Sequence, residues 1–123
     1  MKWWNAMKYE IKMKLPSANE YIRWCRSNRY LAAQKKAQIE TLIASHIKYM
    51  PRYEKPVKIH FTWVEENKRR DLDNICFAKK FILDALVKEG KLADDNRRNV
   101  YAFTDSFEYS NEAKVILEVI ENE

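Results

Sequence analysis

The sequence predicts an α/β domain of the α+β kind, in which two main helices pack on one mixed sheet. Three observations predict it. Two segments alternate apolar and charged residues as strands do, two others have helical periodicity, and two further strand-like segments close the chain. The expected order is strand, helix, strand, helix, strand, strand. No linker, repeat or low-complexity segment is visible, so residues 1–123 are predicted to form a single domain.

The first half of the chain supplies one strand and one helix. Residues 8–15 alternate, and their apolar positions are Tyr9, Ile11, Met13 and Leu15. Pro16 stops this strand, and residues 16–28 are expected to be a loop with aromatic and basic character. From about Leu31 to Tyr49 there is no Pro or Gly, and apolar residues recur at helical spacing.

The second half supplies the remaining elements. Residues 57–64 alternate again and predict the second strand, which a charged loop of residues 65–70 follows. Residues 73–89 have the pattern of the second helix. Residues 98–106 and 113–120 predict two closing strands.

Gly90 is the only glycine, and it comes where a left-handed helix cap favours glycine. A single glycine excludes glycine-rich phosphate loops and the dinucleotide fingerprint, so no nucleotide cofactor is expected. Two distant cysteines, Cys25 and Cys76, and two histidines exclude a zinc site and a disulfide framework. Carboxylates, lysines and arginines remain available for chemistry.

The basic residues are unevenly distributed. Residues 1–104 hold 22 Lys and Arg against 12 Asp and Glu, whereas residues 105–123 hold one lysine against six acids. This surplus favours a polyanionic partner such as nucleic acid, and a merely solvated basic surface is the equal alternative. No apolar run has the length of a membrane span or a signal peptide, so a cytoplasmic protein without membrane contact is expected.

The residues Asp71 and Asp73 lie between the second strand and the second helix. In extended backbone they point the same way, and two carboxylates side by side persist easily only with a cation between them. All-oxygen ligation favours Mg²⁺ or Mn²⁺. For the D-x-D pattern alone, the more frequent arrangement is one aspartate capping the helix and the other solvated.

Two further features favour the metal site. Asp94 and Asp95 follow the helix after a short loop and offer a third carboxylate. On an ideal helix with Asp73 at 0°, Lys80 falls near 340° and Lys79 near 240°, while the apolar face spans about 120–200°. Lys80 therefore shares a stripe with Asp73, as expected for a lysine beside a metal-nuclease site. Its alternative is a surface lysine paired with Asp84.

Several other residues are ambiguous. Trp3, Trp4, Tyr21 and Trp24 could stack on bases, but core or dimer-interface positions are more frequent, and we favour those for Trp3 and Trp4. Nothing around Cys76 requires a thiolate, and His60 is expected at the surface rather than as a base. Four arginines are candidate phosphate contacts, namely Arg69, Arg70, Arg97 and Arg98. Solvated surface charges are an equally good interpretation of them.

The segments Arg70-Asp71-Leu72-Asp73-Asn74, Lys80 to Leu86 and Asp94-Asp95 together resemble the signature of the RusA family of Holliday junction resolvases. The segment Leu15-Pro16-Ser17-Ala18-Asn19 is similar to an early segment of that family. The resemblance implies a small homodimeric endonuclease of bacteria and their phages, here a phage- or prophage-like member, that cuts four-way DNA junctions with Mg²⁺. It also implies that Asp71, Asp73 and Asp95 bind metal and that Lys80 is the essential lysine.

The chain departs from the family pattern by three extra residues between Asn74 and the lysine. The spacing from Lys80 through Asp84 to Asp95 is kept and selects Lys80, whereas counting forward from Asp73 selects Phe77, which cannot serve. Three residues are almost one helical turn, so the lysine stays on the same face of the helix but shifts by about 4.5 Å along its axis.

The sequence therefore favours a crossover junction endodeoxyribonuclease, a hydrolase of DNA recombination and repair that makes symmetric paired nicks. Asp71, Asp73, Lys80 and Asp95 are its expected catalytic residues. Two alternatives stay open: a metal-dependent nuclease that prefers other branched or duplex DNA, and a non-catalytic nucleic-acid-binding protein.

Overall fold

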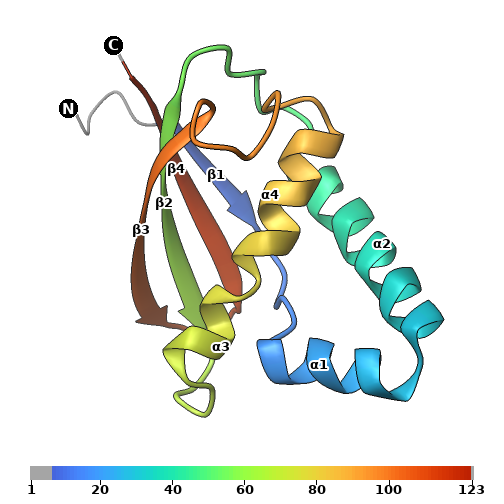
Figure 1. Cartoon of the computed structure of the whole chain (residues 1–123). Helices are drawn as coiled ribbons and strands as arrows, with labels where there is room; N and C mark the ends of the chain where they lie inside the picture. The colour runs from blue at the N-terminus through green and yellow to red at the C-terminus, as the bar shows by residue number, and fades with distance from the viewer. Residues whose placement is uncertain (1–6, 123) are drawn as a thin grey trace.

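The computed structural model describes residues 7–122, which form one four-stranded sheet with the helices on one side of it (Figure 1). The strands are β1 (Met7–Ile11), β2 (Val57–Glu65), β3 (Val100–Tyr109) and β4 (Lys114–Glu121). The helices are α1 (Ala18–Ser27), α2 (Arg29–His46), α3 (Leu72–Cys76) and α4 (Lys79–Lys88). The predicted fold class and mixed sheet are confirmed.

The sheet has the strand order β1-β4-β2-β3. Strands β2 and β3 are parallel, whereas β4 runs antiparallel to both β1 and β2. A parallel pair needs a crossover connection, and α3 with α4 provides it. The candidate residues before and within α3 and α4 thus belong to the crossover that covers the sheet. Strand β1 ends before the expected Leu15, because the chain turns where the Met13 amide donates to the Ile11 carbonyl at 2.9 Å.

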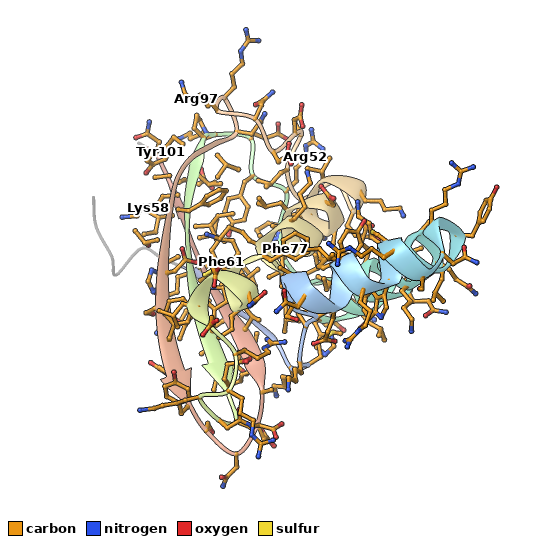
Figure 2. All side chains as sticks on the ribbon, turned by 60° about the horizontal axis from the view of Figure 1, so that its bottom comes forward. Arg52, Lys58, Phe61, Phe77, Arg97 and Tyr101 are labelled. Atoms are coloured by element: carbon orange, nitrogen blue, oxygen red, sulfur yellow. The ribbon has the colours of Figure 1, made fainter. Side chains whose placement is uncertain are left out.

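The hydrophobic core lies between the sheet and the helices. The alternate residues of β2 that were expected on one face are buried there, namely Val57, Ile59, Phe61 and Trp63. The rings of Phe61 and Trp63 stack with centroids 5.5 Å apart. Figure 2 shows Phe61 and Phe77 in the space between the sheet and the helices. This packing holds the crossover segment against the sheet.

The loop expected over residues 16–28 is wrong, because this segment forms α1. Ser17 caps the helix: its Oγ accepts from the amide of Glu20 at 3.2 Å and donates to the Glu20 carboxylate at 3.3 Å. The Ser-x-x-Glu spacing is a known helix start signal. Asn28 ends α1 and caps α2, where its Oδ1 accepts from the amide of Tyr30 at 2.8 Å.

The single helix expected over residues 73–89 is divided into α3 and α4 at Phe77 and Ala78. Both residues keep right-handed helical dihedrals, but the Ala78 amide donates to the Ile75 carbonyl, which tightens the chain locally to three residues per turn. The predicted cap is confirmed. Gly90 has φ +72°, and its amide donates to the Val87 carbonyl at 3.0 Å.

Candidate nuclease site

The carboxylate pair Asp71 and Asp73 lies where the loop after β2 enters α3. Asp71 occupies the N-cap position in extended backbone, and its carbonyl accepts from the Ile75 amide at 3.1 Å. Its side chain makes no capping hydrogen bond, so the alternative in which this aspartate serves as the helix cap is not observed. Both aspartates are exposed, and within residues 7–122 neither carboxylate has a basic partner.

Lys80 connects α4 to the predicted third aspartate. Its Nζ lies 3.1 Å from Asp84 Oδ1 and 3.4 Å from Asp95 Oδ2. Lys36 of α2 reaches the other oxygen of Asp84 at 3.0 Å. Burial by itself would raise the pKa of Asp84, but hydrogen bonds from the two lysines outweigh it and hold this pKa below its usual value. The hydrogen bond to Asp84, with the charges of Asp84 and Asp95, raises the pKa of Lys80.

The segment after α4 faces this cluster across a cavity of about 360 Å³. Asp94 shapes the segment, because its Oδ1 accepts from the Asp95 amide at 2.8 Å and its Oδ2 accepts from the Asn96 side chain at 3.2 Å. Asp95 instead faces Lys80. The alternative for Lys80, an exposed lysine paired with Asp84, is therefore observed. The same lysine also contacts Asp95, the aspartate that the family resemblance selects.

The structure does not gather the three predicted metal ligands into one cluster. In Figure 1 the loop entering α3 lies at the lower end of the sheet, whereas the segment between α4 and β3 lies at the upper end. Among residues 7–122, no three Asp, Glu, His or Cys side chains are placed to hold a metal ion together. Asp71 and Asp73 fit a hard divalent cation, because they offer exposed oxygen donors that no basic side chain of this part of the chain engages. Metal ligation by Asp71, Asp73 and Asp95 stays a prediction.

Lys79, which lies about 100° from Lys80 on the helical wheel, contacts the sheet. Its Nζ lies 2.9 Å from Asp105 Oδ2 and stands over the rings of Phe61 and Phe103, at 5.0 and 4.8 Å from their centroids. The other oxygen of Asp105 accepts from Trp63 Nε1 at 2.9 Å. Asp105 was missed, although it occupies a helix-facing position of an alternating strand, where an acid signals a fixed partner.

Three of the four arginines considered for DNA contact are exposed, namely Arg69, Arg97 and Arg98. Figure 2 shows Arg97 at the rim of the molecule. Arg70 differs, because its guanidinium is held within the chain by Glu65 at 2.8 Å and by the Leu15 carbonyl at 2.9 Å. The charged residues 65–70 predict a loop, and nothing in that pattern indicates the pairing of Glu65 with Arg70.

The ambiguous aromatic and polar residues resolve in part. Tyr21 packs against the rings of Phe77 and Phe81, with centroids 5.6 and 5.5 Å away, so the core interpretation is confirmed for it. His60 hydrogen-bonds Thr104 and Ser106 on the sheet face opposite the helices. Burial, then the charge of Asp105, raises the pKa of the Cys76 thiol, which disfavours a thiolate. Trp3 and Trp4 lie outside the described residues.

The fold and these side chains define a class of protein: a small basic α+β domain with exposed paired carboxylates and arginines, as a nuclease requires. The family model for Endodeoxyribonuclease RusA matches residues 4–120 of the 123. The chain therefore belongs to the RusA endodeoxyribonuclease family of Holliday junction resolvases. The comparison with curated proteins found no match. Within residues 7–122, no helix combines the length and apolar character needed to cross a membrane.

Proposed function

We propose that this chain is a Mg²⁺-dependent homodimeric endonuclease that resolves four-way DNA junctions by symmetric paired nicks in DNA recombination and repair. Family membership supports the nuclease activity and the junction substrate. The observation that carries the proposal is the pair of exposed carboxylates at the start of α3. Asp71 and Asp73 have no basic partner among the described residues, and Asp71 is not used as a helix cap.

The proposed reaction is in-line hydrolysis of a phosphodiester bond. Asp71 and Asp73 would hold Mg²⁺, and Mn²⁺ suits the same oxygen donors. Asp95 would become a third ligand only where the two loops, which lie at opposite ends of the sheet, are brought together. The bound ion would supply an activated water and positive charge beside the phosphate. Lys80 holds its ammonium group next to Asp95 on a side chain that is 60% exposed, so it can reach a phosphate oxygen without leaving a buried pair.

Positive charge near the candidate site supports DNA binding. Lys68 and Arg69 are exposed on the loop that precedes the carboxylate pair, and Arg97 and Arg98 are exposed on the segment after Asp95. Contacts of this kind position a phosphate backbone without reading its sequence. They also make binding weaken as salt concentration rises.

The homodimer is supported by the outward face of α2. Although 33% of the chain is charged, every exposed position from Tyr30 to Ser45 carries an uncharged side chain. A cavity of about 560 Å³ on this face is lined by Gln34, Ala37, Gln38, Thr41 and Leu42. The one lysine on this stripe, Lys35, is only part-exposed and stands over the Trp24 ring at 5.0 Å from its centroid. Two copies of net charge +5 can therefore meet on this face with few opposing like charges. A two-fold axis through it would give the two active sites that paired nicks require.

A substrate panel tests the proposal. Synthetic four-way junctions, flaps and linear duplexes of the same arm sequences are incubated with the protein in Mg²⁺ and, separately, in EDTA. We expect junction cutting that Mg²⁺ supports and EDTA abolishes. Preferred cutting of flaps or linear duplex would identify a nuclease of another substrate class. Binding of junctions without any cutting in Mg²⁺ or Mn²⁺ would contradict the enzymatic proposal.

A further inference from the structure

We propose that Glu65 is a positioning residue, which acts through Arg70 to fix the backbone that carries Asp71 and Asp73; this inference rests on the proposed function. Glu65 is the last residue of β2, and Arg70 immediately precedes the carboxylate pair. Between them runs the loop of residues 66–69, in which every residue is exposed. The two ends of this loop are thus joined by their own side chains.

The contact between Glu65 and Arg70 is a two-point contact away from solvent. Arg70 Nε lies 2.8 Å from Glu65 Oε1, and Arg70 Nη2 lies 3.2 Å from Glu65 Oε2. The side chain of Arg70 is 15% exposed and that of Glu65 is 10% exposed. A guanidinium held at two points by a carboxylate is fixed in orientation as well as in position.

The third nitrogen of Arg70 ties the same unit to the N-terminal part of the domain. Nη1 donates to the Leu15 carbonyl at 2.9 Å and lies 3.7 Å from Glu20 Oε1. Glu20 is itself held by Ser17, the residue that caps α1. Arg70 therefore connects the end of β2, the segment before α1 and the first turn of α1.

The positions of Asp71 and Asp73 depend on the contacts of Arg70, because within residues 7–122 their own side chains make no contact that would hold them in place. Asp71 makes no capping hydrogen bond, and among the described residues neither Asp71 nor Asp73 has a basic partner. The position of Asp71 is then set by its backbone, and its Cα lies one peptide, about 3.8 Å, from that of Arg70. Within the loop, Asn67 Oδ1 accepts from the Arg69 amide at 3.0 Å, which shapes the turn but does not fasten it to the domain.

The test compares Glu65→Gln with a matched control, Glu10→Gln. Glu10 lies on the edge strand β1 and also pairs with a basic residue, Lys114 of the neighbouring strand β4, at 3.2 Å. The readouts are single-turnover cleavage of a four-way junction at saturating protein, junction affinity, thermal stability, and amide hydrogen exchange over residues 66–74. Arg70→Lys, which keeps the charge and loses the two-point contact, serves as a second variant.

In the Glu65→Gln and Arg70→Lys proteins, we expect the amide hydrogens of residues 66–74 to exchange with solvent faster than in the wild type. Both proteins should remain folded. Their cleavage rate should fall about 10- to 100-fold, because displacing a reacting group lowers the rate of the chemical step. Their affinity for the junction should change far less. Glu10→Gln should leave both readouts as in the wild type. Loss of cleavage only in proportion to the unfolded fraction, or unchanged exchange in residues 66–74, would overturn the inference. If the wild type cuts no junction, the proposed function fails, and the exchange data alone still decide whether Glu65 fixes this loop.

Discussion

Two adjacent lysines at the start of α4 make different contacts, so their replacement should have different effects. Lys80→Ala removes an ammonium group that is 60% exposed, and we expect it to change the free energy of unfolding by less than about 1 kcal/mol. Its cleavage rate should fall by about 10²- to 10³-fold, as when one preorganised donor is lost. Lys79→Ala removes the partner of Asp105 and should cost about 1.5–3 kcal/mol of stability.

Thermal unfolding and single-turnover cleavage at saturating enzyme separate these effects, since saturation keeps binding defects out of the comparison. Lys55→Ala, at an exposed lysine of the segment between α2 and β2, is the control and should change neither. If Lys79→Ala keeps full stability yet loses as much cleavage as Lys80→Ala, the assignment of Lys80 across the three-residue insertion is wrong.

The helical wheel predicted that these two lysines diverge, but not what Lys79 contacts. On the helical wheel, Lys79 lies only about 40° from the apolar face of the helix. Its long side chain can therefore lie along the core while its ammonium group pairs with an acid at the edge of the core. The partner, Asp105, comes from β3, and only the tertiary structure brings it to α4.

At the scale of the elements, the end of α4 gives a direct stability test at Gly90. Its φ of +72° disfavours any residue with a Cβ, although the nearest atom to an added Cβ would be Arg52 Nη1 at 3.8 Å. Gly90→Ala should therefore lower stability by about 1 kcal/mol through backbone strain rather than a clash. Gly90→Asn should cost less, because Asn tolerates the left-handed region. Equal unfolding midpoints for wild type and both variants would refute the role of this cap.

Local sequence signals predicted most of the elements and missed those that depend on paired caps or packing. The strand β2 has clear periodicity, the long run without Pro or Gly indicated α2, and Gly90 marked the end of α4. The helix α1 was missed although Ser17 and Glu20 have the Ser-x-x-Glu spacing of a helix start, because its polar, arginine-rich residues resemble a loop. The division at Phe77 and Ala78 could not be read from periodicity, since both residues keep helical dihedrals.

For the whole molecule, the uncharged face of α2 predicts how two copies associate. Leu42 is 51% exposed on this face, and Leu42→Glu would place two like charges near a two-fold axis. Light scattering should give twice 14.8 kDa for the wild type and 14.8 kDa for the variant. Met7→Glu, at an apolar position that is 57% exposed on β1, is the control and should remain dimeric. A dimeric Leu42→Glu protein would place the interface elsewhere, and a monomeric wild type would contradict the homodimer.

The candidate site was predicted residue by residue, but its assembly was not. The pairing of Lys80 with Asp84 follows from helix geometry. The extended backbone considered for residues 70–73 is not observed at Asp73, which lies in the first turn of α3. The family resemblance selected Lys80 and Asp95 as site residues, and the structure brings these two residues together. Whether the carboxylate pair and Asp95 close around one ion depends on the arrangement of two loops at opposite ends of the sheet, which no local pattern determines.

The central claim is tested most directly by single-turnover cleavage of a four-way junction by Asp73→Asn in Mg²⁺. This change keeps the shape of the side chain and removes one negative charge, so cleavage should fall by orders of magnitude while junction binding persists or strengthens. Glu121→Gln makes the same charge change at an exposed acid at the end of β4, and it should cut at close to the wild-type rate. If Asp73→Asn cuts the junction as fast as the wild type, the paired carboxylates are not the active site.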